Sequence, residues 1–246
     1  VNDLVDLDAD RRHLQKRRRP LASGALPIPA GIALAIVLLI FSAAIAVLLD
    51  RFLLSAGASE SWAFVTVLLT YIVLTTSYSL ALKRVAILDV LVLASLYTIR
   101  IFAGSQATAI PVSQWLLAFS MFLFLSLALL KRYSELHNLR LRDEEQAPGR
   151  GYRSTDIDLV AALGAASGYI SVLVLALYIQ SETVRTLYAQ PTWIWAICPA
   201  VLYWISRLWL VAHRGEMHED PIVFAIKDRA SYALAAVLAL VMLLAL

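Results

Sequence analysis

Long apolar stretches alternate with short polar segments along almost the whole chain. A helix needs about 20 mainly apolar residues to cross a hydrocarbon core of about 30 Å. By this criterion the pattern predicts seven membrane-spanning helices, and Pro199 is expected to kink the sixth. The predicted spans are residues 30–49, 62–82, 85–103, 113–130, 157–179, 192–212 and 230–246. The fold class predicted is therefore an all-α, polytopic membrane helical bundle.

Composition supports a membrane protein over a soluble domain. Apolar residues make up 61% of the chain, charged residues 16%, and the mean hydropathy is +0.75. Soluble domains are about 45–50% apolar, so one soluble domain could not cover this much apolar surface. Cys198 is the only cysteine, which excludes an internal disulfide or a cysteine-built zinc site.

The positive charges lie mainly on one side of the predicted membrane. Of the 21 Lys and Arg residues, all but Arg51, Arg100 and Arg185 fall on that side. It collects residues 1–29, 83–84, 131–156 and 207–229. The positive-inside rule makes this side cytoplasmic. We therefore expect an integral membrane protein with a cytoplasmic active site and no nucleic-acid partner, and the family resemblance given below implies a bacterial plasma membrane.

Acidic side chains at the start of the chain share one face of a helix, if residues 1–11 are helical. Asn2, Asp3, Asp6 and Asp10 then lie within about 100° of each other, whereas Asp8 points away. Neighbouring carboxylates repel one another unless a cation lies between them. Oxygen-only ligands suit Mg²⁺, which bridges carboxylates to substrate phosphates.

A basic run follows the acidic stripe at residues 16–19 and offers cationic partners for phosphate. The stripe and the run together favour a site for a metal and a diphosphate. The alternative is a solvated acidic cap followed by membrane-anchoring charge. Arg100 lies deep in a predicted span, where both a role inside the bundle and outward snorkelling stay open. Asp89 is about 16 Å from it along the helix, too far to pair.

The motif Asn-Asp-x-x-Asp-x-x-x-Asp at residues 2–10, with Arg-Pro-Leu-x-Ser-Gly at 19–24, closely resembles the first Asp-rich motif of the UbiA superfamily of intramembrane prenyltransferases. The resemblance covers essentially residues 1–246 and implies nine transmembrane helices, with this motif at the cytoplasmic end of the second. Helix one and most of helix two are then expected to be missing. A soluble domain, fused or partner, is a further expectation before Val1.

The second Asp-rich motif of that superfamily is expected in a loop at 131–156, but Asp-x-x-x-Asp is absent there. Residues 131–137, Lys-Arg-Tyr-x-Glu-Leu-His, instead resemble the decaprenyl-phosphate phosphoribosyltransferase branch. That resemblance implies phosphoribosyl transfer from phosphoribosyl diphosphate to a polyprenyl phosphate. Prenyl transfer from a polyprenyl diphosphate to an aromatic acceptor such as 4-hydroxybenzoate is the alternative. A transporter and an inactive membrane anchor are alternatives of other classes.

The residue patterns and the resemblance together assign a role to each candidate residue. The partners that they imply are the bilayer, a polyprenyl lipid and a phosphorylated donor. The Mg²⁺ ligands predicted are Asn2, Asp3, Asp6 and Asp10. The catalytic residues predicted are Asp6, Asp10, Lys16 and Glu135. The substrate-binding residues predicted are Arg11, Arg17, Arg19, Tyr78, Lys83, Lys131, Arg132 and Tyr133.

Overall fold

The computed structural model describes residues 2–12, 16–55, 62–141, 143, 150–217 and 220–245. These residues form α-helices and 3-10 helices and no strand, which confirms the predicted all-α class. The chain divides into two compact units that are described separately below. Unit 1 comprises residues 1–83 and 99–111, and unit 2 comprises residues 84–98 and 112–246.

Unit 1 begins with short helices and continues into two long ones. Its elements are α1 (Asn2–Val5), α2 (Leu7–Arg12), η1 (Lys16–Arg18), α3 (Ile28–Ser55) and α4 (Ala63–Leu80). The 3-10 turn η2 (Leu82–Arg84) follows α4. Helix α5 (Leu88–Thr108) contributes its second half, from residue 99, to unit 1 and its first half to unit 2.

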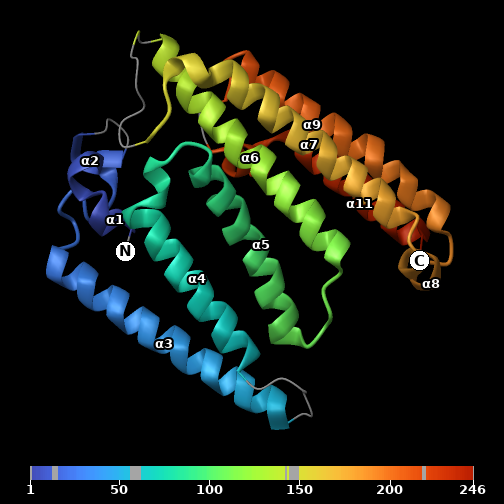
Figure 1. Ribbon diagram of the computed structural model, residues 1–246, viewed down its shortest axis with the longest axis horizontal. Helices are drawn as coiled ribbons and strands as arrows, with labels where there is room; N and C mark the ends of the chain where they lie inside the picture. The colour runs from blue at the N-terminus through green and yellow to red at the C-terminus, as the bar shows by residue number, and fades with distance from the viewer. Residues whose placement is uncertain are drawn as a thin grey trace. The chain divides into compact units, whose positions relative to one another are not determined.

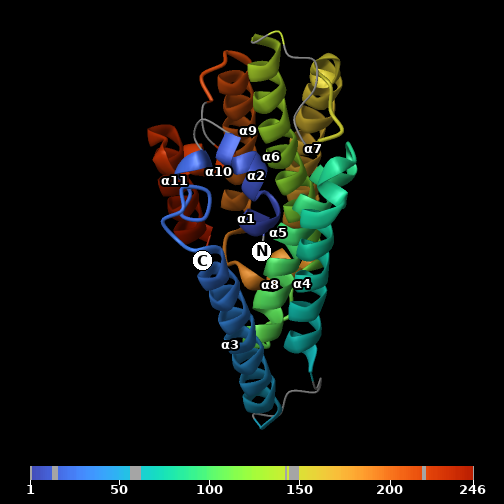
Figure 2. The same ribbon diagram turned by 90° about the vertical axis from the view of Figure 1, so that its left-hand side faces the viewer.

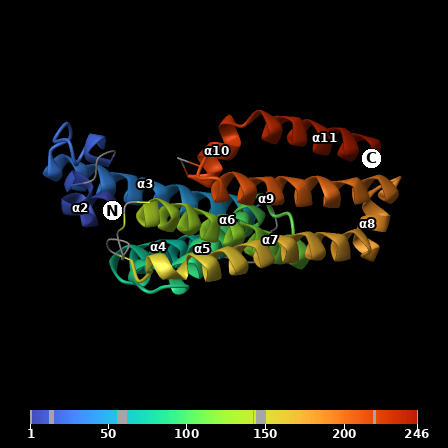
Figure 3. The same ribbon diagram turned by 90° about the horizontal axis from the view of Figure 1, so that it is seen from above.

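Unit 2 holds the remaining helices. They are α6 (Gln114–Leu141), η3 (Ser154–Asp156), α7 (Ile157–Ile179), α8 (Glu182–Leu187), η4 (Pro191–Ala196), α9 (Ile197–His213), α10 (Pro221–Lys227) and α11 (Arg229–Ala245). Six described helices of the chain are long and apolar enough to cross a membrane. A seventh span is reached only if α10 and α11, which are bent by 76°, count as one (Figure 3).

In unit 1, α3 and α4 lie side by side (Figure 1). The first span was predicted to end before Asp50, but α3 continues to Ser55. The reason is that the buried Asp50 carboxylate has partners in the next helix. It accepts hydrogen bonds from the backbone N–H groups of Phe64 (3.1 Å) and Val65 (2.9 Å). Asp50 therefore caps the N-terminus of α4 instead of ending α3.

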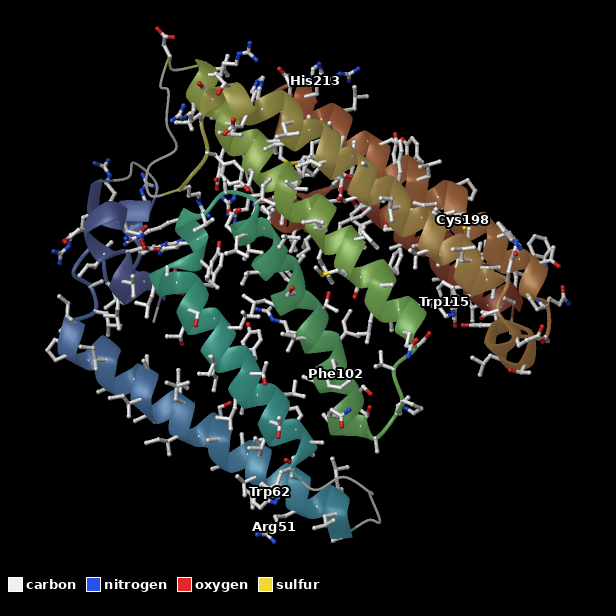
Figure 4. The ribbon with its side chains drawn as sticks, in the orientation of Figure 1. Arg51, Trp62, Phe102, Trp115, Cys198 and His213 are labelled. Atoms are coloured by element: carbon white, nitrogen blue, oxygen red, sulfur yellow. The ribbon has the colours of Figure 1, made fainter. Side chains whose placement is uncertain are left out.

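Aromatic side chains mark the starts of three spans. Trp62 precedes α4, Trp115 opens α6 and Trp193 lies in η4, and all three are exposed. The Arg51 guanidinium carbon lies 5.1 Å from the centroid of the Trp62 ring, and the two side chains are neighbours in Figure 4. This distribution is typical of residues at a membrane–water interface.

The core of unit 2 depends on close packing of α6, α7 and α9, which run side by side in Figures 1 and 2. Gly164 and Gly168 on α7 allow this approach. A Cβ atom on Gly164 would lie 2.2 Å from Trp209 of α9, and one on Gly168 would lie 2.6 Å from Ile205. Small residues spaced four apart bring membrane helices together in this way.

Gly164→Ala is therefore expected to destabilise the protein by about 1–3 kcal/mol, because the Trp209 ring must move out of a packed core. Thermal unfolding in detergent measures the change. Gly104→Ala in α5 is the matched control, because nothing lies within 4 Å of the added methyl group. Its expected effect is neutral, or stabilising by up to about 1 kcal/mol. Equal losses in both variants would contradict the packing explanation.

Two predictions about unit 2 are wrong, one about the end of α6 and one about Pro199. Residues 131–141 were predicted to be loop, but α6 continues through them to Leu141. Its 28 residues span about 42 Å, longer than a hydrocarbon core. Pro199 was predicted to kink a span, but it lies in the first turn of α9, where its missing N–H removes little helical hydrogen bonding.

Candidate functional site

The acidic motif of unit 1 is helical, and a turn at Asp6 separates α1 from α2 (Figure 2). The Asp6 N–H donates to the Asn2 carbonyl (2.9 Å), and the Asp10 N–H donates to the Asp6 carbonyl (2.8 Å). These i to i−4 bonds keep Asp6 and Asp10 one turn apart on one side, as the predicted stripe requires.

Two cations bind the three carboxylates of this stripe. Arg19 Nη1 donates to Asp3 Oδ1 at 2.9 Å and to Asp10 Oδ2 at 2.8 Å. Lys83 Nζ donates to Asp6 Oδ1 at 2.5 Å. Asp10 is only 3% exposed and Lys83 9% exposed, so these charges are poorly solvated. We call Asp3, Asp6, Asp10, Arg19 and Lys83 the acidic cluster.

The acidic cluster has three carboxylates and two cations, and therefore one excess negative charge. Among the described residues no three or more His, Cys, Asp or Glu side chains gather closely enough to enclose a metal. Mg²⁺, however, usually binds one or two carboxylates and completes its shell with water and substrate phosphates. The donor chemistry of Asp6 and Asp10 fits such a shared site better than a metal cage made by protein alone.

The other predicted residues of unit 1 take varied positions. Asn2, Arg11 and Arg17 are exposed, and Tyr78 is half-buried on the last turn of α4. Asp8 is exposed. The side chain of Lys16 lies outside the described residues, although its backbone begins η1. The roles predicted for all of these residues stay predictions.

An apolar groove with a volume of about 630 Å³ runs along one face of α4 and ends at Leu82. Thr66 and Thr70 line it among aliphatic side chains, but both hydroxyls donate to carbonyls of the preceding turn. Because these hydroxyls are already bonded, and Ser77 is the one other polar residue of the lining, the groove surface is mainly apolar.

Arg100 has an aromatic partner in unit 1. Its Nη2 donates to the Tyr71 hydroxyl at 2.6 Å, and its guanidinium carbon lies 5.4 Å from the centroid of the Tyr71 ring. The sequence had left open a role for Arg100 inside the bundle and outward snorkelling. The contacts with Tyr71 fix the position of the charge next to α4.

A buried ionic network lies in unit 2, centred on Asp89 at the start of α5. Asp89 is fully buried and Arg132 is 1% exposed. Arg132 Nε donates to Asp89 Oδ2 at 2.7 Å, and its Nη1 donates to Glu135 Oε2. Arg150 lies 3.4 Å from Asp89 Oδ2 and 3.7 Å from Glu135 Oε2. Arg132, predicted to contact substrate, is instead buried between two carboxylates.

The segment 150–152 docks onto the start of α5. The Tyr152 hydroxyl donates to Asp89 Oδ1 at 2.7 Å and accepts from the N–H of Ile87 at 2.8 Å. Burial, and then the neighbouring Asp89 carboxylate, raise the pKa of the Tyr152 hydroxyl, which keeps it a hydrogen donor. A Cβ on Gly151 would lie 2.7 Å from the Arg84 carbonyl oxygen, so glycine is needed for this approach.

Two predicted substrate-binding residues of α6 also have partners in unit 2. Lys131 Nζ donates to Asp220 Oδ2 at 2.5 Å, and Asp220 also caps α10 by accepting from the Ile222 N–H at 3.0 Å. The Tyr133 hydroxyl lies 3.1 Å from Nδ1 of His213. The Lys131 side chain is 40% exposed, so a competing anion can reach it.

Comparison with known proteins identifies the family. The model of the UbiA prenyltransferase family matches residues 1–227. This chain belongs to the UbiA prenyltransferase family. The UbiA family consists of membrane transferases that generally depend on a divalent metal, and the long apolar helices make this member of the family an integral membrane protein. This membership disfavours the transporter alternative.

The chain is similar to proteins of several bacteria. The chain is 38% identical over 240 residues to the uncharacterized protein y4nM of Sinorhizobium fredii, covering 97% of this chain and 44% of that protein. It is 37% identical over 231 residues to the nodulation protein NoeC of Azorhizobium caulinodans, covering 94% of this chain and 72% of NoeC. Against the decaprenyl-phosphate phosphoribosyltransferase of Mycobacterium tuberculosis, it is 37% identical over 137 residues, which is 56% of this chain and 42% of that enzyme. The chain thus spans less than half the length of two of these three relatives.

For this UbiA domain, sequence reasoning missed Asp89, Arg150 and Tyr152. Asp89 was considered only as a partner for Arg100, because helical spacing is the information that a single sequence offers. Its actual partner, Arg132, is 43 residues away. A charged residue in the first turn of an apolar helix was the available signal.

Proposed function

We propose that this chain transfers a phosphoribosyl group from phosphoribosyl diphosphate to a polyprenyl phosphate in a Mg²⁺-dependent reaction. The observation that carries the proposal is the acidic cluster, in which three carboxylates and two cations, among them the buried Asp10 and Lys83, lie together with one excess negative charge. The similarity to decaprenyl-phosphate phosphoribosyltransferases supports this donor and acceptor class.

In this reaction the bond between the anomeric carbon and the diphosphate oxygen breaks, and an acceptor phosphate oxygen bonds to that carbon. The acceptor is already anionic, so no strong general base is required. Asp6 and Asp10 would hold the metal, and the chemistry that it would supply there is neutralisation of charge on the leaving diphosphate. Lys83 and Arg19 exchange their carboxylate partners for phosphate oxygens, to which both donate charge-assisted hydrogen bonds.

Other residues of the chain take the remaining parts of the two substrates. Lys16 assists the departure of the diphosphate, while Arg11, Arg17 and Tyr78 bind phosphate oxygens. Within unit 2, taken by itself, Lys131 is expected to bind the 5-phosphate of the donor and Glu135 to orient its ribose hydroxyls, while a binding role for the buried Tyr133 stays a prediction. The groove on α4 suits an isoprenoid tail, because its surface is mainly apolar.

The direct test is incubation of the full-length protein in detergent with Mg²⁺, phosphoribosyl diphosphate labelled in the ribose, and decaprenyl phosphate. We expect label in the lipid fraction, and its loss when EDTA removes the metal. The matched reaction contains decaprenyl diphosphate and 4-hydroxybenzoate instead. Prenylation of the aromatic acid without use of phosphoribosyl diphosphate would overturn the proposed donor and leave the family assignment intact.

The proposal places the acidic cluster on the cytoplasmic side of a bacterial inner membrane. On a Cys198→Ala background, Ser23→Cys precedes α3 and Ser55→Cys ends it, and both positions are exposed. An impermeant thiol reagent added to spheroplasts is expected to label Ser55→Cys and not Ser23→Cys. Lysis of the spheroplasts should then expose Ser23→Cys. The reverse order of labelling would invert the topology.

A further inference from the structure

We infer that Asp89 is a positioning residue that fixes the orientation of Glu135 by way of Arg132 and Arg150. This inference deepens the proposed function, because it rests on Glu135 acting on the donor. The geometry that carries it is a closed ring of four charges in unit 2, in which each of two arginines contacts the same two carboxylates.

The ring has a buried end and an open end. Asp89 is fully buried, while the Glu135 side chain is 38% exposed. Arg132 and Arg150 lie between them, and the planar guanidinium groups transmit orientation because their donors form a rigid fork. A rotation of the Asp89 carboxylate therefore changes the direction from which Arg132 and Arg150 hold Glu135.

Both oxygens of Asp89 are engaged, which makes the buried end rigid. Oδ2 accepts from Arg132 and Oδ1 accepts from the Tyr152 hydroxyl. Tyr152 is held in turn by the N–H of Ile87, whose φ of 67° is unusual for a β-branched residue. Gly151 packs against the 84–86 backbone between the two anchoring side chains of this segment.

Stability alone is a weak reason for such an arrangement. Desolvating a buried ion pair costs about as much as the pair regains, so an apolar replacement is often neutral or stabilising. Arg132 and Glu135, one turn apart on α6, form an ion pair without help from α5. Asp89 gives Arg132 a second carboxylate partner besides Glu135, and the same Asp89 carboxylate also forms an ion pair with Arg150. This pattern defines one orientation for the half-buried Glu135 carboxylate.

A double-mutant cycle tests the inference, with Asp89→Asn, Glu135→Gln and the double variant assayed for phosphoribosyl transfer. Asp89→Asn is expected to lower kcat by about tenfold with little change in the donor KM, as misplacement of a reacting group does. In the Glu135→Gln background the same change should have no further effect. Independent, additive losses would overturn the inference, since additivity is the behaviour of residues that do not act through one another.

Two further variants keep the result interpretable. Tyr152→Phe retains every ion pair but removes one anchor of Asp89, and we expect a smaller kcat loss that also disappears in the Glu135→Gln background. If Asp89→Asn fails to fold, Tyr152→Phe becomes the test of the positioning role. A wild-type kcat in Tyr152→Phe would then overturn the inference. Asp228→Asn is the control in the same unit. It removes the charge of a carboxylate that accepts two hydrogen bonds from Arg207, and its kcat should match the wild type.

Failure of the proposed function gives a different result. If the wild type transfers no phosphoribose, the proposed function is wrong. If the wild type transfers it and Glu135→Gln does so at the same rate, the role of Glu135 is wrong, and the inference about Asp89 falls with it. If Glu135→Gln is impaired and Asp89→Asn is not, the proposed function stands and the positioning role of Asp89 is wrong.

Discussion

Replacing Asp6 or Asp10 with Asn is expected to reduce turnover by at least about a hundredfold and to weaken Mg²⁺-dependent binding of the donor. Each change removes one carboxylate charge from the acidic cluster, and with it the excess negative charge that attracts a metal. Lys83 also loses its charged partner in the first variant. Titration calorimetry with phosphoribosyl diphosphate, with and without Mg²⁺, measures binding separately from turnover.

Asp8→Asn is the matched control, since Asp8 belongs to the same short helical segment but is exposed and lies off the stripe. Its turnover and donor binding are expected to stay within about twofold of the wild type. Equal damage from Asp6→Asn, Asp8→Asn and Asp10→Asn would contradict the assignment of the metal to one helical face. Asp10 is buried, so thermal unfolding of each variant must accompany the assays.

Lys131→Ala is expected to lower kcat/KM for the donor by about 10–100-fold, the loss of a charge-assisted contact of about 1.5–3 kcal/mol. Without the donor, the Lys131 ammonium binds the Asp220 carboxylate. The proposed 5-phosphate contact must therefore displace Asp220. Steady-state kinetics with varied phosphoribosyl diphosphate measures the effect.

Asp220→Asn provides the complementary test, because it removes the competing carboxylate and keeps the amide oxygen that can cap α10. The donor KM is then expected to fall. Lys227→Ala, at the exposed end of α10, should leave kcat/KM unchanged. A donor KM that is unaffected by Lys131→Ala would show that Lys131 serves only to hold α10.

Local patterns accounted for the parts of this protein that depend on neighbours in sequence. The spans could be predicted because each long helix carries its own apolar surface into the membrane, whatever it packs against. The common face of Asp6 and Asp10 followed from helical geometry alone. The predicted end of the first span was wrong because a local pattern shows Asp50 only as a charge that ends an apolar stretch. Its stabilising partners, two amides of α4, lie 14 and 15 residues further along the chain.

The sequence by itself determined the helical membrane class, the positions of most spans and the acidic stripe, because these follow from short-range periodicity. Tertiary structure alone decided which charges are paired. It assigned Lys83 to Asp6, 77 residues apart, and Arg132 to Asp89, and it made the last span a bent pair of helices. Such pairings depend on how helices approach one another. Many combinations of a carboxylate and a cation in a single sequence would neutralise charge equally well, so the sequence does not select one. Burial then selects among them, because a desolvated charge is tolerated only where its partner lies within hydrogen-bonding distance.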